Sequence, residues 1–172
     1  MQRFLIVVDM QNDFISMALG TNEARLIVPG VREKIESFDG KVIFTRDTHT
    51  EAYLTTREGR YLPVAHCVEG TKGWEIEDSL KGLRCDAIFD KPTFGSTALG
   101  EYLVKENEKE PIESVTLVGL CTDICVISNA MLIKASLPEI DVVVESALCA
   151  GVTPESHQRA LEAMTMCQII VK

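Results

Sequence analysis

The feature that most constrains this chain is the alternation of short apolar runs with amphipathic segments from one end to the other. The runs are rich in β-branched and aromatic residues, as buried strands are. They recur at Phe4–Val8, Val42–Phe44, Ala87–Phe89, Val115–Val118, Val142–Val144 and Ile169–Val171. Strands that alternate with helices build a parallel sheet covered on both faces. The sequence therefore predicts an α/β fold with three layers, α/β/α, around a mostly parallel, doubly wound sheet of about six strands.

The segments between these runs carry helical signals. Helices are predicted around Val31–Phe38, which follows Pro29, and at Ala98–Asn107, Asp123–Leu137 and Pro154–Met166. The last has a threonine in the N-cap position and proline at its first helical position. Residues 46–78 are the exception, because they form a long polar stretch. Loops of that length are usually functional or disordered.

Length and charge narrow the functional classes. The 172 residues suit a single domain spanning 1–172. A net charge of −9 without a Lys/Arg-rich tract argues against a nucleic-acid partner. No apolar run is long enough for a bilayer, and the start MQRFLIVVDMQNDF does not resemble a signal peptide. We therefore expect a cytoplasmic protein without a membrane partner, in which the six cysteines are reduced thiols.

Chemically capable side chains stand where the predicted strands end. Asp9 closes the first strand, Asp47 follows the second, Lys91 follows the third, and Cys125 opens the helix after the fourth. In open parallel sheets, ligands bind outside the carboxyl ends of the strands. Taken singly, each residue has a commoner structural explanation: a core cysteine, a turn aspartate or a solvated lysine. Their convergence on one edge favours a catalytic site.

Cys125 is the candidate nucleophile of this site. A position near a helix N-terminus favours a thiolate, and Lys91 adds a positive charge. Asp9 could accept the thiol proton and later deliver it to a leaving amine. The backbone amides of a sharply turning loop at 119–124 could hold an oxyanion. The residues alone thus indicate a Cys–Asp–Lys set.

Three blocks of the sequence, LIVVDMQNDF, FDKPTFGST and LVGLCTDICVISNA, resemble the cysteine hydrolases of the isochorismatase-like superfamily, and the nicotinamidases among them. The resemblance covers essentially the whole chain. It implies that Cys125 is the nucleophile, Asp9 the acid/base and Lys91 the stabilising cation. It also implies a cis peptide bond at Leu120–Cys121 and an oxyanion hole made by the amides of Cys121 and Cys125. By the same resemblance, Phe14 and Phe94 would wall an aromatic ring into the pocket.

The long polar stretch also holds candidate metal ligands. Asp47 and His49 are two residues apart, and Glu58 and His66 complete a mixed nitrogen and oxygen set suited to zinc, iron or manganese. Nicotinamidases are similar, since many bind a divalent metal through an Asp-x-His start and a later histidine. This chain departs from them at Thr55, near the place of a common second histidine, and Glu58 looks like its substitute. The alternative is that His49 and Glu58 are solvated loop residues.

The leading hypothesis from the sequence is hydrolysis of nicotinamide to nicotinate and ammonia through a cysteine thioester. Alternatives are another hydrolase of the superfamily, acting on a carbamoyl or ureido group or on isochorismate, a non-catalytic metal-binding member, and a thiol redox sensor built on Cys121 and Cys125. The expected partner is a small carboxamide, with a homo-oligomer as a further expectation. Tyr61 and Trp74 are candidates to cover the pocket mouth, and a structural anchor beside Gly73 is the alternative interpretation of Trp74. His157 is interpreted as a surface residue.

Overall fold

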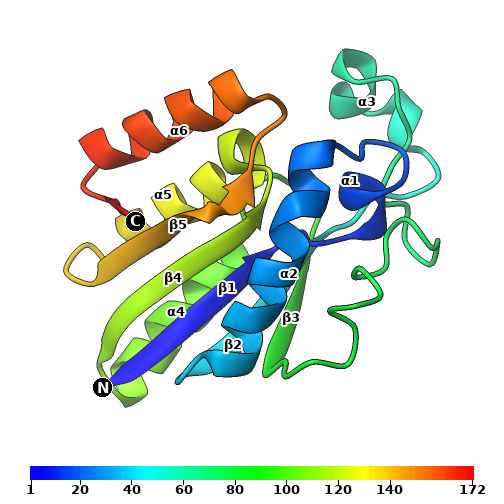
Figure 1. The fold of residues 1–172 in the computed structure, drawn as a ribbon. Helices are drawn as coiled ribbons and strands as arrows, with labels where there is room; N and C mark the ends of the chain where they lie inside the picture. The colour runs from blue at the N-terminus through cyan, green and yellow to red at the C-terminus, as the bar shows by residue number, and fades with distance from the viewer.

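The computed structural model describes all residues, 1–172, and places a single six-stranded sheet at the centre of the molecule (Figure 1). Every pair of neighbouring strands is parallel, and the strand order is β3-β2-β1-β4-β5-β6. The strands are β1 (Gln2–Val8), β2 (Lys41–Asp47), β3 (Ala87–Lys91), β4 (Ile112–Leu120), β5 (Asp141–Ala150) and β6 (Ile170–Val171). Each contains or overlaps one of the apolar runs. The predicted three-layer α/β/α fold is therefore confirmed.

Helices cover both faces of the sheet (Figure 1). They are α1 (Asn12–Ile15), α2 (Asn22–Ser37), α3 (Arg57–Tyr61), α4 (Thr97–Lys109), α5 (Ile127–Ser136) and α6 (Pro154–Met166). Short helical turns precede α3 and α5, at η1 (Tyr53–Thr55) and η2 (Thr122–Val126). Buried residues of α4, α5 and α6 pack on one face of the sheet, and buried residues of α1 and α2 pack on the other. None of these helices is both long and apolar enough to cross a membrane.

Helix α2 begins earlier than the sequence predicted. It starts at Asn22, where the side chain of Thr21 accepts a hydrogen bond from the Ala24 amide, and Pro29 lies inside it. The prediction placed the helix after Pro29 because proline usually interrupts a helix. The buried positions of α2 nevertheless recur at helical spacing on both sides of the proline, at Ala24, Ile27, Val31 and Ile35. Burial of this continuous face outweighs the hydrogen bond that proline cannot donate.

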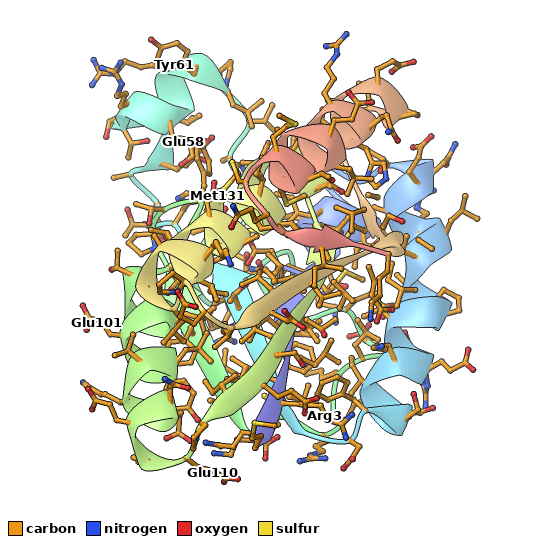
Figure 2. The ribbon with its side chains drawn as sticks, turned by 90° about the vertical axis from the view of Figure 1, so that its left-hand side faces the viewer. Arg3, Glu58, Tyr61, Glu101, Glu110 and Met131 are labelled. Atoms are coloured by element: carbon orange, nitrogen blue, oxygen red, sulfur yellow. The ribbon has the colours of Figure 1, made fainter.

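Beyond the last two residues of β2, the long polar stretch at 46–78 contains only η1, the short α3 and irregular backbone. Helix α3 stands out from the body of the molecule (Figures 1 and 2). An isolated bridge between Gln11 and Ile76 ties the stretch to the segment after β1, and another between His49 and Val68 joins two parts of the stretch itself. The stretch thus forms a supported cover above the carboxyl ends of the strands.

Candidate active site

The strand ends bring the three predicted catalytic side chains into contact. Asp9 directly follows β1, Lys91 is the last residue of β3, and Cys125 lies in η2 just beyond β4. The Lys91 ammonium lies 2.6 Å from Asp9 Oδ2 and donates a hydrogen bond to Cys125 Sγ over 3.4 Å. All three side chains are buried. One lysine therefore contacts both the candidate acid/base and the candidate nucleophile.

Asp9 is held in a rare backbone conformation. Its φ of +48° lies in the left-handed region, which few residues other than glycine adopt. The Thr45 hydroxyl donates a 2.6 Å hydrogen bond to Asp9 Oδ1, while Lys91 approaches the other carboxylate oxygen. The conformation turns the chain out of the sheet immediately after β1, and the two partners fix the carboxylate. Its geometry is thus set before any substrate arrives.

Burial controls the protonation states of this group. It raises the pKa of Asp9, although Lys91 opposes that effect. Burial alone would lower the pKa of Lys91, but the neighbouring acidic groups, Asp9 first, raise it overall, so the amine stays charged. Burial, reinforced by Asp9, also raises the pKa of Cys125 well above the usual range. The resting nucleophile is therefore a neutral thiol, and the thiolate expected from the helix N-terminus is not favoured before substrate binds.

The loop between β4 and the nucleophile makes a sharp turn. Gly119 has a φ of +115°, and a Cβ built there would lie 2.2 Å from the Val8 carbonyl oxygen, so only glycine fits. The Leu120–Cys121 peptide bond is cis. The Cys121 amide donates no hydrogen bond to the rest of the protein, whereas its carbonyl accepts from Ile124 and Val126. This amide beside the nucleophile has the character expected of an oxyanion-hole donor.

Cys121 itself shows the features of an inert thiol. It is half-buried, and burial raises its pKa to about 12. No disulfide joins it to Cys125, and all six cysteines are free. An inert thiol is a poor redox partner, because reactivity follows thiolate character. The structure thus gives no support to the alternative of a redox pair.

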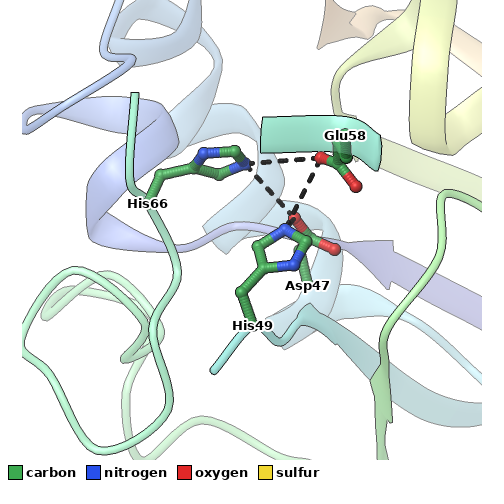
Figure 3. A group of neighbouring side chains, drawn as sticks. All are labelled: Asp47, His49, Glu58 and His66. Atoms are coloured by element: carbon green, nitrogen blue, oxygen red, sulfur yellow. Dashed lines mark hydrogen bonds and ion pairs between the residues drawn. The ribbon is translucent and has the colours of Figure 1, made fainter. Parts of the chain in front are cut away.

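The four candidate metal ligands form a compact cluster (Figure 3). One ligand atom from each of Asp47, His49, Glu58 and His66 lies within 4.8 Å of the others. Nε2 of His49 is 2.9 Å from Asp47 Oδ2 and 3.6 Å from Glu58 Oε1, and Nε2 of His66 is 3.6 and 3.9 Å from the same two oxygens. The structure therefore brings all four together.

This donor set fits a divalent metal. Ligands about 2.0–2.2 Å from a tetrahedral zinc ion stand roughly 3.3–3.6 Å from one another, which is close to the separations found here. The Val64 carbonyl lies 2.8 Å from His66 Nδ1, which orients the ring so that Nε2 faces the cluster. Tyr53 packs against both imidazoles, with ring centroids 4.7 Å from His49 and 4.9 Å from His66. Two imidazoles and two carboxylates suit zinc, iron or manganese.

Asp47 connects the two groups of side chains. Its Oδ2 faces His49 in the cluster, and its buried Oδ1 accepts no hydrogen bond and lies 3.6 Å from the Lys91 ammonium. Burial opposes ionisation of this carboxyl, but His49, His66 and Lys91 together hold its pKa below the usual range. The Asp47 carboxylate is therefore anionic and contacts both the cluster of candidate metal ligands and Lys91.

A cavity of about 360 Å³ opens onto both groups. Cys125 and Cys121 line it together with Asp47, Glu58 and His66, and most of its other walls are apolar. Phe14 and Phe94 both line the cavity, as predicted, the first half-buried and the second 45% exposed. A pocket with apolar walls and a few convergent polar groups is typical of a small-molecule site.

Two residues proposed for the pocket mouth behave differently. Tyr61 lines the cavity and is 79% exposed. It lies at the end of α3, on the outer side of the molecule (Figure 2). Trp74 lies outside it: its ring stacks against the Arg46 guanidinium at 3.7 Å, and its indole N–H donates to the Thr48 hydroxyl. The interpretation of Trp74 as a structural anchor is therefore the correct one.

His157 was expected on the surface, and the structure corrects this. It is half-buried, and its Nδ1 lies 2.8 Å from the Thr122 hydroxyl in η2. The polar sequence neighbours of His157 gave no sign of this contact, which arises because α6 packs against η2 in the folded chain.

Several supporting residues were not singled out from the sequence. The Gln11 side chain forms paired hydrogen bonds with the Asp47 backbone, at 2.7 and 2.8 Å, and Asp13 accepts a 2.7 Å hydrogen bond from the Cys67 amide. These residues anchor the polar stretch at 46–78, which holds the four candidate metal ligands, to the segment after β1. Their polarity within the DMQNDF block was a signal, but their partners lie far away in the sequence. Thr45, Tyr53 and Asn129 are further examples.

Comparisons with known proteins find similar chains and a matching family. The isochorismatase domain family matches residues 3–172. A nicotinamidase from Schizosaccharomyces pombe is 29% identical, over 92% of this chain and 87% of its own length. A nicotinamidase/pyrazinamidase from Mycobacterium tuberculosis is 28% identical, over 97% of this chain and 96% of its own. The crystal structure of a Pyrococcus horikoshii pyrazinamidase in complex with zinc is 30% identical, with a TM-score of 0.83 over 100% of this chain and 99% of the other.

Proposed function

This chain belongs to the isochorismatase family, and from that membership we propose that it hydrolyses nicotinamide to nicotinate and ammonia. The observation that carries the proposal is the shared cavity: Cys125, with Lys91 and Asp9 behind it, lies in the same pocket as a cluster of metal ligands and two phenylalanines. The relatives named as nicotinamidases support this choice of substrate. The catalytic and binding roles given to individual residues below are part of the proposal.

Catalysis begins with a proton transfer. Because burial keeps the Cys125 thiol neutral and raises the pKa of Asp9, the carboxylate can take the thiol proton as sulfur attacks the carboxamide carbon. The carbonyl oxygen becomes an oxyanion, held by the backbone amides of Cys121 and Cys125. Lys91 remains an ammonium throughout and balances the negative charge. A tetrahedral adduct on sulfur results.

The second half of the reaction releases two products. Asp9 gives its proton to the departing nitrogen, the C–N bond breaks, and ammonia leaves a thioester on Cys125. A water molecule then attacks the thioester carbon while Asp9 accepts one of its protons. The C–S bond breaks, Asp9 returns its proton to the departing sulfur, and the nicotinic acid formed loses its proton to solvent and leaves as nicotinate. Asp9 thus serves in turn as base, acid, base and acid.

The cluster of Asp47, His49, Glu58 and His66 would hold a divalent metal, for which zinc is the first candidate because the Pyrococcus horikoshii relative is a zinc complex. When bound, the metal would coordinate the pyridine nitrogen and so orient the ring. Phe14 and Phe94 would pack on the ring and exclude water from the reacting carbon. Binding and bond cleavage thus use different parts of one pocket.

Ammonia release from nicotinamide, measured for the wild type and Cys125→Ala side by side, tests the proposal. We expect release by the wild type only, with the thermal unfolding midpoint of the variant close to the wild-type value because one small side chain is removed. Substantial activity in the variant would overturn the nucleophile assignment. If the folded, metal-loaded wild type releases ammonia from a carbamoyl or ureido compound and not from nicotinamide, the substrate assignment is wrong. The cytoplasmic location and the homo-oligomer stay predictions.

A further inference from the structure

Asn129 occupies a position between the nucleophile and the loop that carries the lysine. It lies in the first turn of α5 and is only 1% exposed. Its Nδ2 donates hydrogen bonds to the carbonyl oxygens of Cys125, at 2.8 Å, and Phe94, at 3.2 Å. Its Oδ1 accepts a 3.0 Å hydrogen bond from the Ser96 amide. One buried side chain therefore joins the backbone of Cys125 to the segment after β3.

That segment is in close contact with the helix. A Cβ built on Gly95 would lie 2.5 Å from Leu132 Cδ1 and 3.2 Å from the Ser128 carbonyl oxygen. The same segment holds Lys91, because the ammonium donates to the Thr93 carbonyl over 3.2 Å. Movement of this segment relative to α5 would therefore displace the lysine and the wall residue Phe94 relative to the cysteine.

An asparagine suits this position because its amide offers two donor hydrogens and an acceptor in one plane. The Nδ2 group donates to the carbonyl oxygens of Cys125 and Phe94, and Oδ1 accepts from the Ser96 amide at the start of α4. Ser96 is itself the N-cap of α4, accepting from the Leu99 amide. The bridge therefore reaches from η2 through α5 to the N-terminus of α4.

We propose that Asn129 is a positioning residue that fixes the Cys125 thiol relative to Lys91 and Phe94. The inference rests on the proposed function in taking Cys125 as the nucleophile, but it does not depend on which carboxamide is the substrate. Errors of about 1 Å in the placement of reacting groups can lower a rate about a hundredfold. The 3.4 Å contact between Lys91 and the sulfur is the distance that the bridge maintains.

The first test uses iodoacetamide as the probe and measures the alkylation rate of each cysteine by peptide mass spectrometry in the metal-loaded protein. The exposed Cys85 is an internal reference. We expect Asn129→Ala to slow alkylation of Cys125 about tenfold or more, with Cys85 unchanged, because the lysine no longer contacts the sulfur correctly. An unchanged Cys125 rate would overturn the proposal. This readout needs no turnover, so it remains decisive if nicotinamide is not the substrate.

Asn107→Ala is the matched control. It also removes an asparagine bonded to backbone, since Asn107 Oδ1 accepts from the Ile112 amide over 2.8 Å, but it lies far from the site. We expect this control to keep the wild-type alkylation rate and kcat, while Asn129→Ala loses about tenfold to a hundredfold in kcat. Equal losses in both variants at equal unfolding midpoints would show a merely structural role and contradict the proposal.

Asn129→Ser provides the second variant if the alanine protein does not fold. A serine hydroxyl can donate to the carbonyl four residues earlier, so the contact with Cys125 is restored, but it is too short to reach Phe94 or Ser96. We expect the alkylation rate of Cys125 and kcat of the serine variant to lie between the values of the wild type and the alanine variant. If only the serine variant folds, we expect both to be severalfold below the wild-type values. Wild-type values for both quantities would overturn the bridge between the two segments.

Discussion

The triad and the metal cluster lie side by side, yet they are built differently. Asp9 and Lys91 stand at strand ends, where the parallel sheet fixes the backbone, and Cys125 lies in the short helical turn η2 just beyond β4. In the cluster only Asp47 belongs to a strand, and Glu58 is contributed by the protruding α3 with 24% of its side chain exposed. The groups proposed to make and break bonds thus lie at or near strand ends, whereas most of the groups proposed to hold a metal come from a loop.

The difference teaches where precision is needed. Proton transfer and sulfur attack depend on distances of a few tenths of an ångström, and rigid elements supply that accuracy. A metal ion itself organises its ligands, so a loop pinned at a few points is sufficient. The Gln11–Ile76 bridge and the side-chain hydrogen bonds of Gln11 and Asp13 provide those points here. The two regions should therefore respond differently to substitution.

The largest effect is expected from Asp9→Asn, which removes the acid/base and leaves the metal cluster intact. We expect kcat to fall on the order of 10³–10⁴-fold, because no neighbour can take the thiol proton, while the metal content stays at the wild-type value. Steady-state kinetics and elemental analysis measure the two quantities. Asp39→Asn, at an exposed carboxylate that pairs with Arg3, is the control. A large loss of metal from Asp9→Asn would contradict the separation of the two regions.

Lys91→Met should lower kcat by roughly 10²–10³-fold and make stability depend on pH. Without the ammonium, the buried Asp9 carboxyl has a pKa raised further, so the folded protein keeps a proton that the unfolded chain releases near pH 4. The free energy of unfolding of the variant therefore falls as pH rises: the loss is small near pH 4 and reaches about 3 kcal/mol at neutral pH. Urea unfolding at several pH values measures this.

The control for this prediction is Lys81→Met, at an exposed lysine that pairs with Glu75. An exposed ion pair contributes less than about 1 kcal/mol, so we expect only a small change in the free energy of unfolding. The loss of unfolding free energy caused by Lys91→Met should be larger at neutral pH than at pH 4. An equal or smaller loss at neutral pH would contradict the role assigned to the buried ion pair.

Removal of the metal should act on substrate binding more than on the thiol. We expect His66→Ala to lose bound metal and to lower kcat/KM about 10²-fold, while Cys125 is still alkylated by iodoacetamide at nearly the wild-type rate. His157→Ala is the control for metal content, because that histidine lies outside the cluster. Strong loss of Cys125 reactivity in His66→Ala would show that the two regions do not act separately.

The smallest effect is expected at the most exposed ligand. Glu58→Gln keeps an oxygen ligand but removes a charge, so we expect metal affinity to fall about tenfold and kcat at saturating metal to stay within about twofold of the wild type. Competition with a chelator of known affinity measures the change. An affinity equal to that of the wild type would show that Glu58 is not a ligand.

Much of this contrast was accessible from the sequence. The β-branched runs and the order of strands and helices are local signals, so the sheet, its strand ends and the convergence of Asp9, Lys91 and Cys125 could be predicted. The four candidate metal ligands were predicted from residue types within one loop and from the resemblance to nicotinamidases, and the structure brings them together. The predicted start of α2 was wrong because the effect of a proline is read locally, whereas the apolar face that outweighs it is stabilised by tertiary packing.

The supporting contacts could not be predicted, for a physical reason. Apart from the bond between Asn129 and Cys125, the side chains of Asn129 and Gln11 contact backbone atoms 33–63 residues away. A side chain bonded to backbone places no requirement on the residue types of its partners. The neutral state of Cys125 also depends on burial from all sides, which the helix N-terminus alone did not reveal. Tertiary packing decides both features.

The most direct test of the central claim is to trap the covalent intermediate. Wild-type protein would be mixed with nicotinamide, quenched in acid within the first turnovers, and digested for mass spectrometry. The account predicts a mass increase of one nicotinoyl group on the peptide that contains Cys125, a species that forms and decays at rates consistent with turnover and is absent from Cys125→Ala. Turnover of nicotinamide with an adduct on another residue, or with Cys125→Ala equally active, would contradict it.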